Sequence, residues 1–121
     1  MISKNQIEEA QEKWGNGVVT IGSLKKQRTE CEIFTKKFLD DRYAFNLGTV
    51  LFKPTKCELQ QFRPTKDEAL SYFIAGDNRT CKEDKGFAIQ PWTKVRFENS
   101  GLILDDKRAI AMGNYFFTDL D

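Results

Sequence analysis

The absence of histidine from this 121-residue chain limits the chemistry that its side chains can do. A Ser-His-Asp or Cys-His mechanism and a histidine general base cannot be built within such a polypeptide. Acid or base catalysis would have to use Asp, Glu, Tyr, Lys, Cys or bound water. Asp41 is one such carboxylate, late in an expected helix. It either faces inward as an acid or base or stays solvated, as most charged side chains do.

Two tryptophans, Trp14 and Trp92, are the side chains best suited to contact an organic ligand. An indole offers a large apolar surface and one N–H donor that usually needs a partner when it is buried. Aromatic residues at helical or strand spacing are more often part of a core than of a pocket, so core packing and ligand binding both stay open. Tyr72 and Tyr115 either donate hydrogen bonds into a cavity or present ring edges to it.

Asn114 interrupts the apolar run Ala109–Thr118, which is the strongest strand pattern in the chain. A buried amide without a hydrogen bond costs roughly 1 to 3 kcal/mol, so this side chain needs a partner. That partner is a ligand, a water molecule or a facing subunit. A structural role and a pocket-lining role for Asn114 are equally open.

The same run is apolar on both alternating faces, which is typical of a strand with hydrogen-bonded neighbours at both edges. Preceding residues can supply one neighbour, and only residues 119–121 follow the run. We therefore expect a second copy of the chain to supply the other neighbour. The result would be a homodimer or a larger homo-oligomer, with Ala111 and Phe116 at its interface.

Three capping-box patterns, each a hydroxyl residue followed three positions later by Glu or Gln, predict three helices. The patterns start at Ser3, Thr29 and Thr65. Gly15 and Gly17 favour a bend or an early end in the first helix, because each costs about 1 kcal/mol relative to alanine. The second helix is expected to end near Gly48.

Strand patterns follow at Thr49–Lys53, Thr93–Phe97, Leu102–Leu104 and Ala109–Thr118, with turns at Asn99–Gly101 and Asp105–Lys107. The polar stretch Arg79–Gly86 reads as a solvated connection. This order predicts one α+β domain over residues 1–121, with helices on one face of a curved antiparallel sheet.

Composition argues against several classes of partner. Nineteen basic and eighteen acidic residues give a net charge of +1 without a basic cluster, so we expect no nucleic-acid binding. No apolar run approaches membrane-spanning length and the N-terminus is polar, so we expect no membrane contact and a cytoplasmic location.

Cys31, Cys57 and Cys81 are widely spaced and lack histidine partners. We predict free thiols, no metal site and no cofactor.

Several stretches of the chain together carry a resemblance to a known family. They are Trp14 with Gly17–Gly22, Val50–Lys56, Phe62–Arg63, Ala69–Phe73, Glu83–Ile89, Pro91–Phe97 and Ala111–Phe116. They resemble an uncharacterised SnoaL-like (polyketide-cyclase-like) group of the nuclear transport factor 2-like superfamily. The resemblance implies a cystatin-like cone of three N-terminal helices packed on a curved antiparallel sheet. Two final strands of that fold are missing here, as expected of a shortened mobile-cassette product or a trimmed chain.

The resemblance also implies a ligand cavity between the concave sheet face and the first helices. Its ligand-binding candidates are Trp14, Tyr72, Trp92, Asn114 and Tyr115, and its catalytic candidates are Asp41 and Tyr72. The implied function is binding of a small hydrophobic ligand, with acid–base catalysis of isomerase, cyclase or hydrolase type as its enzymatic form. The alternative is a non-catalytic oligomerisation or protein-interaction module.

Overall fold

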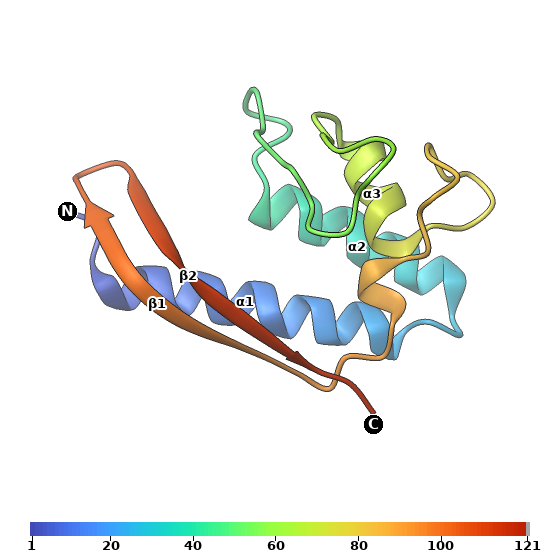
Figure 1. Cartoon of the computed structure of the whole chain (residues 1–121), viewed down its shortest axis with the longest axis horizontal. Coiled ribbons are helices and arrows are strands. Elements are labelled where there is room, and N and C mark those ends of the chain that lie inside the picture. The colour runs from blue at the N-terminus through green and yellow to red at the C-terminus, as the bar shows by residue number, and fades with distance from the viewer. Residues whose placement is uncertain (121) are drawn as a thin grey trace.

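Three helices and one antiparallel strand pair make up the regular structure of the chain (Figure 1). The computed structural model describes residues 1–120. In chain order the elements are α1 (Lys4–Ser23), α2 (Arg28–Arg42), α3 (Lys66–Ile74), the short 3-10 helix η1 (Phe87–Ile89), β1 (Lys94–Leu104) and β2 (Ala109–Thr118). The predicted α+β class is confirmed. None of the helices within this range is long and apolar enough to cross a membrane.

Helix α1 begins as predicted and continues through the two glycines that favoured an early end. The Ser3 hydroxyl accepts a bond from the Gln6 amide, and the Gln6 side chain accepts one from the Ser3 amide, which completes a capping box. Both glycines allow close approach of neighbouring elements. A Cβ on Gly17 would lie 2.5 Å from the Phe38 ring, and one on Gly15 would lie 3.1 Å from Val95. The helix tolerates glycine there because α2 and β1 pack directly against its backbone.

The predictions for α2 and α3 differ in outcome. Helix α2 starts at Arg28 without a side-chain cap, so the capping box expected at Thr29 is wrong, and the helix ends at Arg42, well before Gly48. Helix α3 starts as predicted, because the Thr65 hydroxyl accepts from the Glu68 amide. It ends at Ile74, and the next residue, Ala75, has a φ of 48°, in the left-handed region.

The two strands pair from Lys94 opposite Thr118 to Leu104 opposite Ala109. Two sequence predictions fail here. Asn99–Gly101 forms a bulge inside β1 where a turn was expected, because the partner strand continues past it. Thr49–Lys53 forms no strand, and the backbone bond made there joins the Arg63 amide to the Phe52 carbonyl at 2.9 Å. No neighbouring strand within residues 1–120 reaches this segment.

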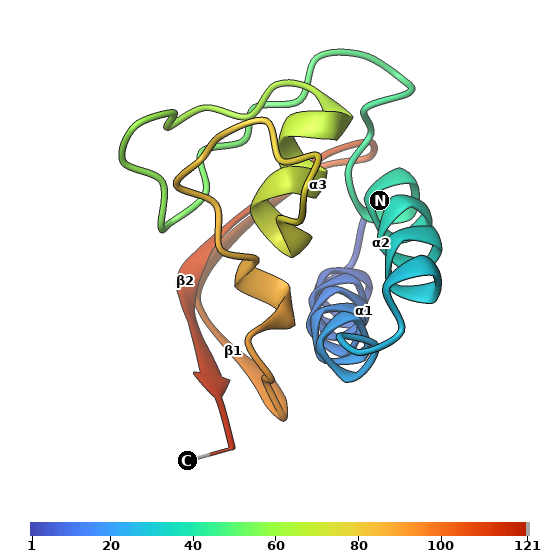
Figure 2. The ribbon, with the colours of Figure 1, turned by 90° about the vertical axis from the view of Figure 1, so that its right-hand side faces the viewer.

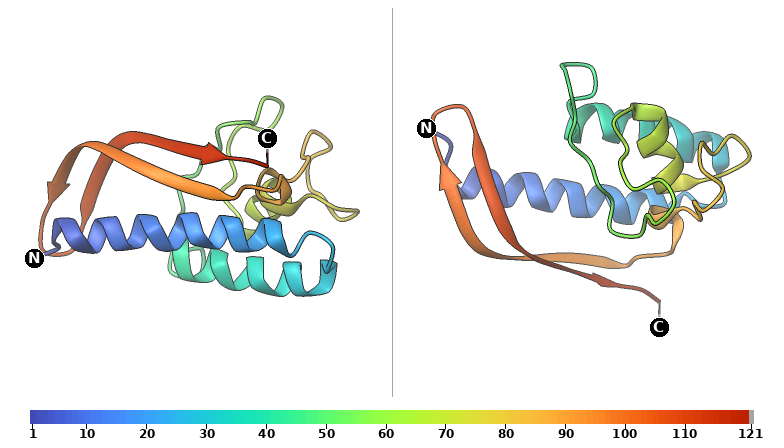
Figure 3. Two further views of the ribbon diagram at one scale, coloured as in Figure 1. Left: turned by 90° about the horizontal axis from the view of Figure 1, so that it is seen from below. Right: turned by 45° about the horizontal axis from the view of Figure 1, so that its top comes forward.

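The strand pair runs along α1, while α2 packs on another side of the same helix and α3 packs against α2 and η1 (Figures 2 and 3). Reciprocal amide bonds between Gln11 and Asn99, at 2.8 and 2.9 Å, join α1 to β1. The buried core lies between the helices and consists of Val18, Ile21, Cys31, Phe38, Leu39, Ala69, Tyr72, Phe73, Ile74 and Ala88. One face of the strand pair therefore packs on α1, and the opposite face of the strand pair is exposed.

The polar stretch Arg79–Gly86, which was expected to be solvated, makes buried hydrogen bonds that hold two loops together. Arg63 (0% exposed) donates two bonds of 2.8 Å to the carboxylate of Asp84 (3% exposed), and Ser71 donates a third. The neighbouring Glu83 carboxylate accepts from the backbone amides of residues 58–60 at 2.7 to 2.8 Å. These contacts fix the long connection between α2 and α3 to the loop that follows α3.

Candidate functional site

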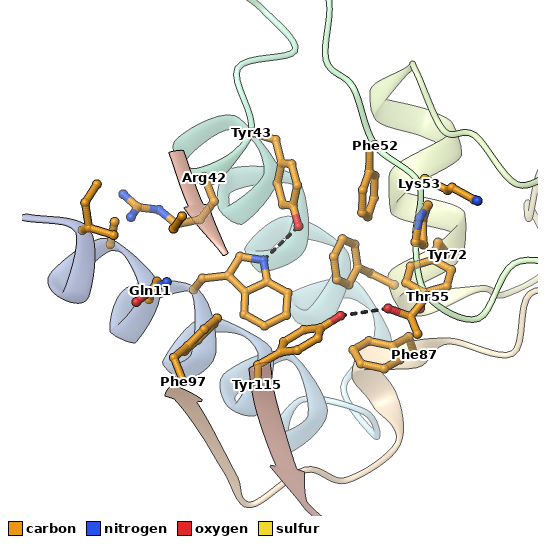
Figure 4. Close-up of a pocket in the computed structure, with 16 residues that line it drawn as sticks. Gln11, Arg42, Tyr43, Phe52, Lys53, Thr55, Tyr72, Phe87, Phe97 and Tyr115 are labelled. Atoms are coloured by element: carbon orange, nitrogen blue, oxygen red, sulfur yellow. Dashed lines mark hydrogen bonds between the residues drawn. The ribbon is translucent and has the colours of Figure 1, made fainter. Parts of the chain in front are cut away.

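An open cavity of about 420 Å³ lies between α1, the end of α2, the connection at Phe52–Thr55, α3 and the strand pair (Figure 4). Its walls are mainly aromatic and aliphatic, and all three tyrosines of the chain line it. The lining residues are Ile7, Ala10, Gln11, Trp14, Arg42, Tyr43, Phe52, Lys53, Pro54, Thr55, Tyr72, Phe73, Phe87, Phe97, Ala111 and Tyr115.

The alternation of side chains along β2 decides which residues reach the cavity. Ala111 and Tyr115 line it, and Phe117 on the same side packs on the core. We call this side the inner face. The residues between them, which include Asn114 and Phe116, point to the opposite, outer face because successive strand side chains alternate.

Trp14 and Tyr43 form the first polar contact in the cavity. The Trp14 indole N–H donates to the Tyr43 hydroxyl oxygen at 2.9 Å. Trp14 comes from the middle of α1, and Tyr43 directly follows the end of α2 at Arg42. The bond therefore joins the two helical segments at the cavity wall, since both residues line the cavity, and Figure 4 shows Tyr43 facing it.

Three more hydroxyl groups lie on the far side of the cavity, those of Thr55, Tyr72 and Tyr115. The Thr55 hydroxyl and the Tyr115 hydroxyl are 2.9 Å apart, and either can be the donor. The Tyr72 hydroxyl oxygen accepts a long bond of 3.4 Å from the Lys56 amide. Tyr43 and Tyr72 thus use their oxygens as acceptors, which leaves the proton of each hydroxyl available to a bound molecule.

The electrostatic character of the cavity favours a small anion. Burial raises the pKa of Tyr43 to about 12, and burial also raises the pKa of Tyr72, so both phenols keep their protons near neutral pH. Arg42 and Lys53 bring positive charge to the lining, and none of the carboxylates of residues 1–120 lines the cavity. The site therefore offers hydroxyl donors and cations to an acceptor.

The structure brings some of the expected site residues together and separates others. Trp14, Tyr72 and Tyr115 line the cavity, as does Ala111, which was expected at an interface. Phe116 lies on the outer face and is 40% exposed, with the Arg96 guanidinium 4.2 Å from its ring centre.

Three expected site residues lie elsewhere. Trp92 donates its indole N–H to the Phe87 carbonyl at 2.8 Å and packs on the core. Asn114 is exposed on the outer face, so the assumption that its amide is buried is wrong. Asp41 pairs with Lys37 at 3.1 Å, one turn away on the exposed side of α2, so it takes the solvated one of the two positions that the sequence left open.

Sequence reasoning missed Tyr43 and Thr55. Tyr43 belongs to the apolar stripe of the second helix, and that pattern alone does not separate a cavity wall from the core. Thr55 follows the predicted strand at Thr49–Lys53, which does not form. The chain holds only three tyrosines, and the structure shows that all of them line the cavity.

The cysteines are free thiols, as predicted, with Cys31 buried and Cys57 and Cys81 partly buried. In the part of the chain that the structure describes, no group of three or more His, Cys, Asp and Glu side chains could hold a metal ion.

Comparison with known proteins gives consistent matches over nearly the whole chain. The family model described as metal-independent carbonic anhydrase matches residues 5–121. A protein named metal-independent carbonic anhydrase from Nostoc sp. (strain PCC 7120) is 36% identical over 121 residues, which cover 98% of this chain and 58% of that protein. The chain thus spans less than two thirds of the length of this curated relative.

A crystal structure of the iota-carbonic anhydrase from a cyanobacterium, in complex with bicarbonate, has the same fold. The TM-score is 0.91 at 34% sequence identity, over 98% of this chain and 74% of that one. These matches overturn the sequence-based resemblance. The assignment to an uncharacterised SnoaL-like group of the nuclear transport factor 2-like superfamily is wrong, because the matching family is a different one.

Proposed function

The chain belongs to the metal-independent carbonic anhydrase family, and from that premise we propose that its cavity catalyses the reversible hydration of carbon dioxide to bicarbonate. The cyanobacterial relative of known structure binds bicarbonate, which supports the same ligand here. This replaces both earlier expectations, an isomerase, cyclase or hydrolase acting on a hydrophobic substrate and a non-catalytic interaction module. Those expectations are overturned by the family match.

The observation that carries the proposal is the convergence of hydroxyl groups on a cavity that none of the carboxylates of residues 1–120 lines. Bicarbonate is a small anion whose oxygens accept hydrogen bonds. Tyr43 and Tyr72 each have a proton to offer, and the pair of Thr55 and Tyr115 adds one donor between them. Because that pair can also accept, it suits the O–H group of bicarbonate.

The apolar walls of the cavity suit the other substrate form, carbon dioxide. Carbon dioxide has no net charge, and the aromatic lining around Phe52, Phe87 and Phe97 offers it a surface without competing charges. In hydration, a water oxygen forms a bond to the carbon, and one C–O π pair moves onto a substrate oxygen. Hydroxyl donors that already point at that oxygen stabilise its growing negative charge without reorganisation.

The proton released from water needs an acceptor other than Tyr43 and Tyr72. The pKa of Tyr43 near 12 and the raised pKa of Tyr72 reflect phenols that hold their protons, which makes them donors and not general bases. The cavity is open, so bulk water or a buffer base takes the proton in our scheme. Carbon dioxide and water then give bicarbonate and one protonated buffer molecule.

The proposal is tested by following carbon dioxide hydration with a pH indicator in a stopped-flow instrument, after the protein has been treated with a chelator. We expect activity in the wild type and a loss of about 10- to 100-fold in Tyr72→Phe, which removes one donor and keeps the ring. Asp41→Asn is the control and should keep full activity, because Asp41 lies outside the cavity. A wild-type protein without activity, both with and without added metal, would refute the proposal.

The assembly expected from the sequence remains a proposal. Met112 (77% exposed) and Ile110 (64% exposed) leave apolar surface on the outer face of β2. We propose that a second copy pairs with β2 and extends the strand pair toward the curved sheet of a cone. Light scattering should show an oligomer for the wild type and a smaller species for Phe116→Asp. A soluble Phe116→Asp oligomer of unchanged size would count against it. A cytoplasmic location is likewise proposed.

A further inference from the structure

The hydrogen bond between Trp14 and Tyr43 has a fixed direction. An indole N–H can donate and cannot accept, so the Tyr43 oxygen must be the acceptor over the 2.9 Å that separates them. The proton of the Tyr43 hydroxyl therefore points away from Trp14. Figure 4 shows the Tyr43 oxygen directed at the cavity, across from Tyr115.

We propose that Trp14 is a positioning residue that holds the Tyr43 hydroxyl as a hydrogen-bond donor toward the substrate in the cavity. This inference rests on the proposed function and adds a role that the family match does not give. Tyr43 would touch the reacting oxygen, and Trp14 would act through Tyr43.

Aromatic packing holds both partners in place. The Trp14 ring contacts Phe97, Phe117 and Phe38, with ring centres 5.9 to 6.4 Å apart. The Tyr43 ring is 5.1 Å from Phe52 and 6.1 Å from Phe73, again between centres. Neither ring can turn without disturbing several neighbours, so the direction of the bond is built into the packing.

The bond also strengthens Tyr43 as a donor. A hydroxyl that accepts one hydrogen bond is polarised and donates a stronger one. The bond from Trp14 lowers the pKa of Tyr43, against the larger effect of burial, which raises it. The hydroxyl is thus a polarised donor that keeps its proton.

Trp92 provides a matched control within the same chain. Its indole N–H also makes one bond, of 2.8 Å, but the acceptor is the backbone carbonyl of Phe87. It does not line the cavity, and its N–H bonds to a backbone carbonyl and not to a hydroxyl group. Loss of an indole N–H at this position should leave catalysis unchanged.

The test is a double-mutant cycle with Trp14→Phe, Tyr43→Phe and the double variant, alongside Trp92→Phe. We expect kcat/KM for hydration to fall on the order of 10- to 100-fold in Tyr43→Phe and about tenfold in Trp14→Phe. The double variant should be no worse than Tyr43→Phe, because Trp14 acts only through that hydroxyl. Additive losses, or full activity in Trp14→Phe beside a loss in Tyr43→Phe, would overturn the inference.

A second measurement does not depend on activity or on a folded Trp14 variant. The two indole N–H groups give separate NMR signals in protein labelled with ¹⁵N. Added bicarbonate should shift the Trp14 signal in the wild type and leave the Trp92 signal in place, and Tyr43→Phe should abolish the response. A response that survives in Tyr43→Phe contradicts the inference. Loss of hydration activity with an intact NMR response would instead count against the proposed function alone.

Discussion

Two polar clusters in this molecule differ in how completely their hydrogen bonds are satisfied. In the buried cluster, Arg63 and Asp84 bond to each other, and Ser71 adds a further donor. In the cavity, Tyr43 and Tyr72 accept one bond each and have a proton left over. A satisfied cluster can only hold the fold together, whereas unsatisfied donors beside solvent can bind an anion.

The largest expected effect comes from breaking the buried cluster. Asp84→Ala would leave the Arg63 guanidinium buried without its carboxylate, and loss of one partner of such a pair costs about 3 to 5 kcal/mol. Urea unfolding should show this as a lower midpoint. The double variant Arg63→Met/Asp84→Ala should recover part of the loss, since the unpaired charge is gone. A change below about 1 kcal/mol in Asp84→Ala would show that the pair does not hold the fold.

The cavity should respond in the opposite way, with lost activity and little lost stability. Thr55→Val and Tyr115→Phe each remove one hydroxyl and keep the shape of the side chain. We expect hydration activity to fall about 10- to 100-fold in each. The free energy of unfolding should change by less than about 1 kcal/mol, because both residues are exposed, Tyr115 by 42%. Equal activity in all three proteins would remove this pair from the site.

The dependence of unfolding free energy on alkaline pH should reveal the raised pKa of the buried Tyr43 phenol. Because the pKa of Tyr43 rises from 10.0 to about 12 on folding, the neutral phenol stabilises the fold below pH 10. That stability is lost as the pH rises from 10 through about 12, and it amounts to roughly 2 to 3 kcal/mol. Urea unfolding from neutral to alkaline pH checks this. Tyr43→Phe should lose less stability over that interval, and an identical decline would contradict the assignment.

The smallest effect is expected at Glu83, which caps the amides of residues 58–60 from the surface. These bonds lower the pKa of its carboxyl from 4.5 to about 2. The stabilisation is therefore present above pH 4.5 and is lost as the pH falls through about 2. Acid unfolding of Glu83→Gln should lack this component. Parallel acid unfolding curves for the two proteins would show that the cap does not stabilise the loop.

Local patterns in the sequence predicted the elements whose formation depends on neighbouring residues. The Ser3 cap, the start of α3 at Thr65 and the final strand Ala109–Thr118 are all confirmed. The strand expected at Thr49–Lys53 depends on a distant partner that a local pattern does not reveal. The bulge at Asn99–Gly101 resembles a turn in composition and differs only in its register with β2.

The sequence predicted site residues correctly only where a side chain with suitable chemistry also lies on the cavity side of its helix or strand. Trp14, Tyr72 and Tyr115 reach the cavity because helical spacing and strand alternation place them on the inner side. Asn114 misled because a polar residue in an apolar strand suggests burial, whereas β2 exposes that face. Trp92 has the chemistry of a ligand contact, but its N–H is satisfied by a backbone carbonyl.

The family assignment failed for a different reason. The stretches Val50–Lys56 and Ala111–Phe116 are too short to separate families, whereas the match over residues 5–121 does separate them.

The most direct test of the open hydroxyl donors is the exchange of oxygen isotopes between carbon dioxide and water, measured at chemical equilibrium on chelator-treated protein. It reports interconversion in the cavity without a dependence on proton release to buffer. The account predicts catalysed exchange by the wild type and its loss in the variant with all three tyrosines changed to phenylalanine, provided that this variant remains folded. Equal exchange by the two folded proteins would contradict the central claim.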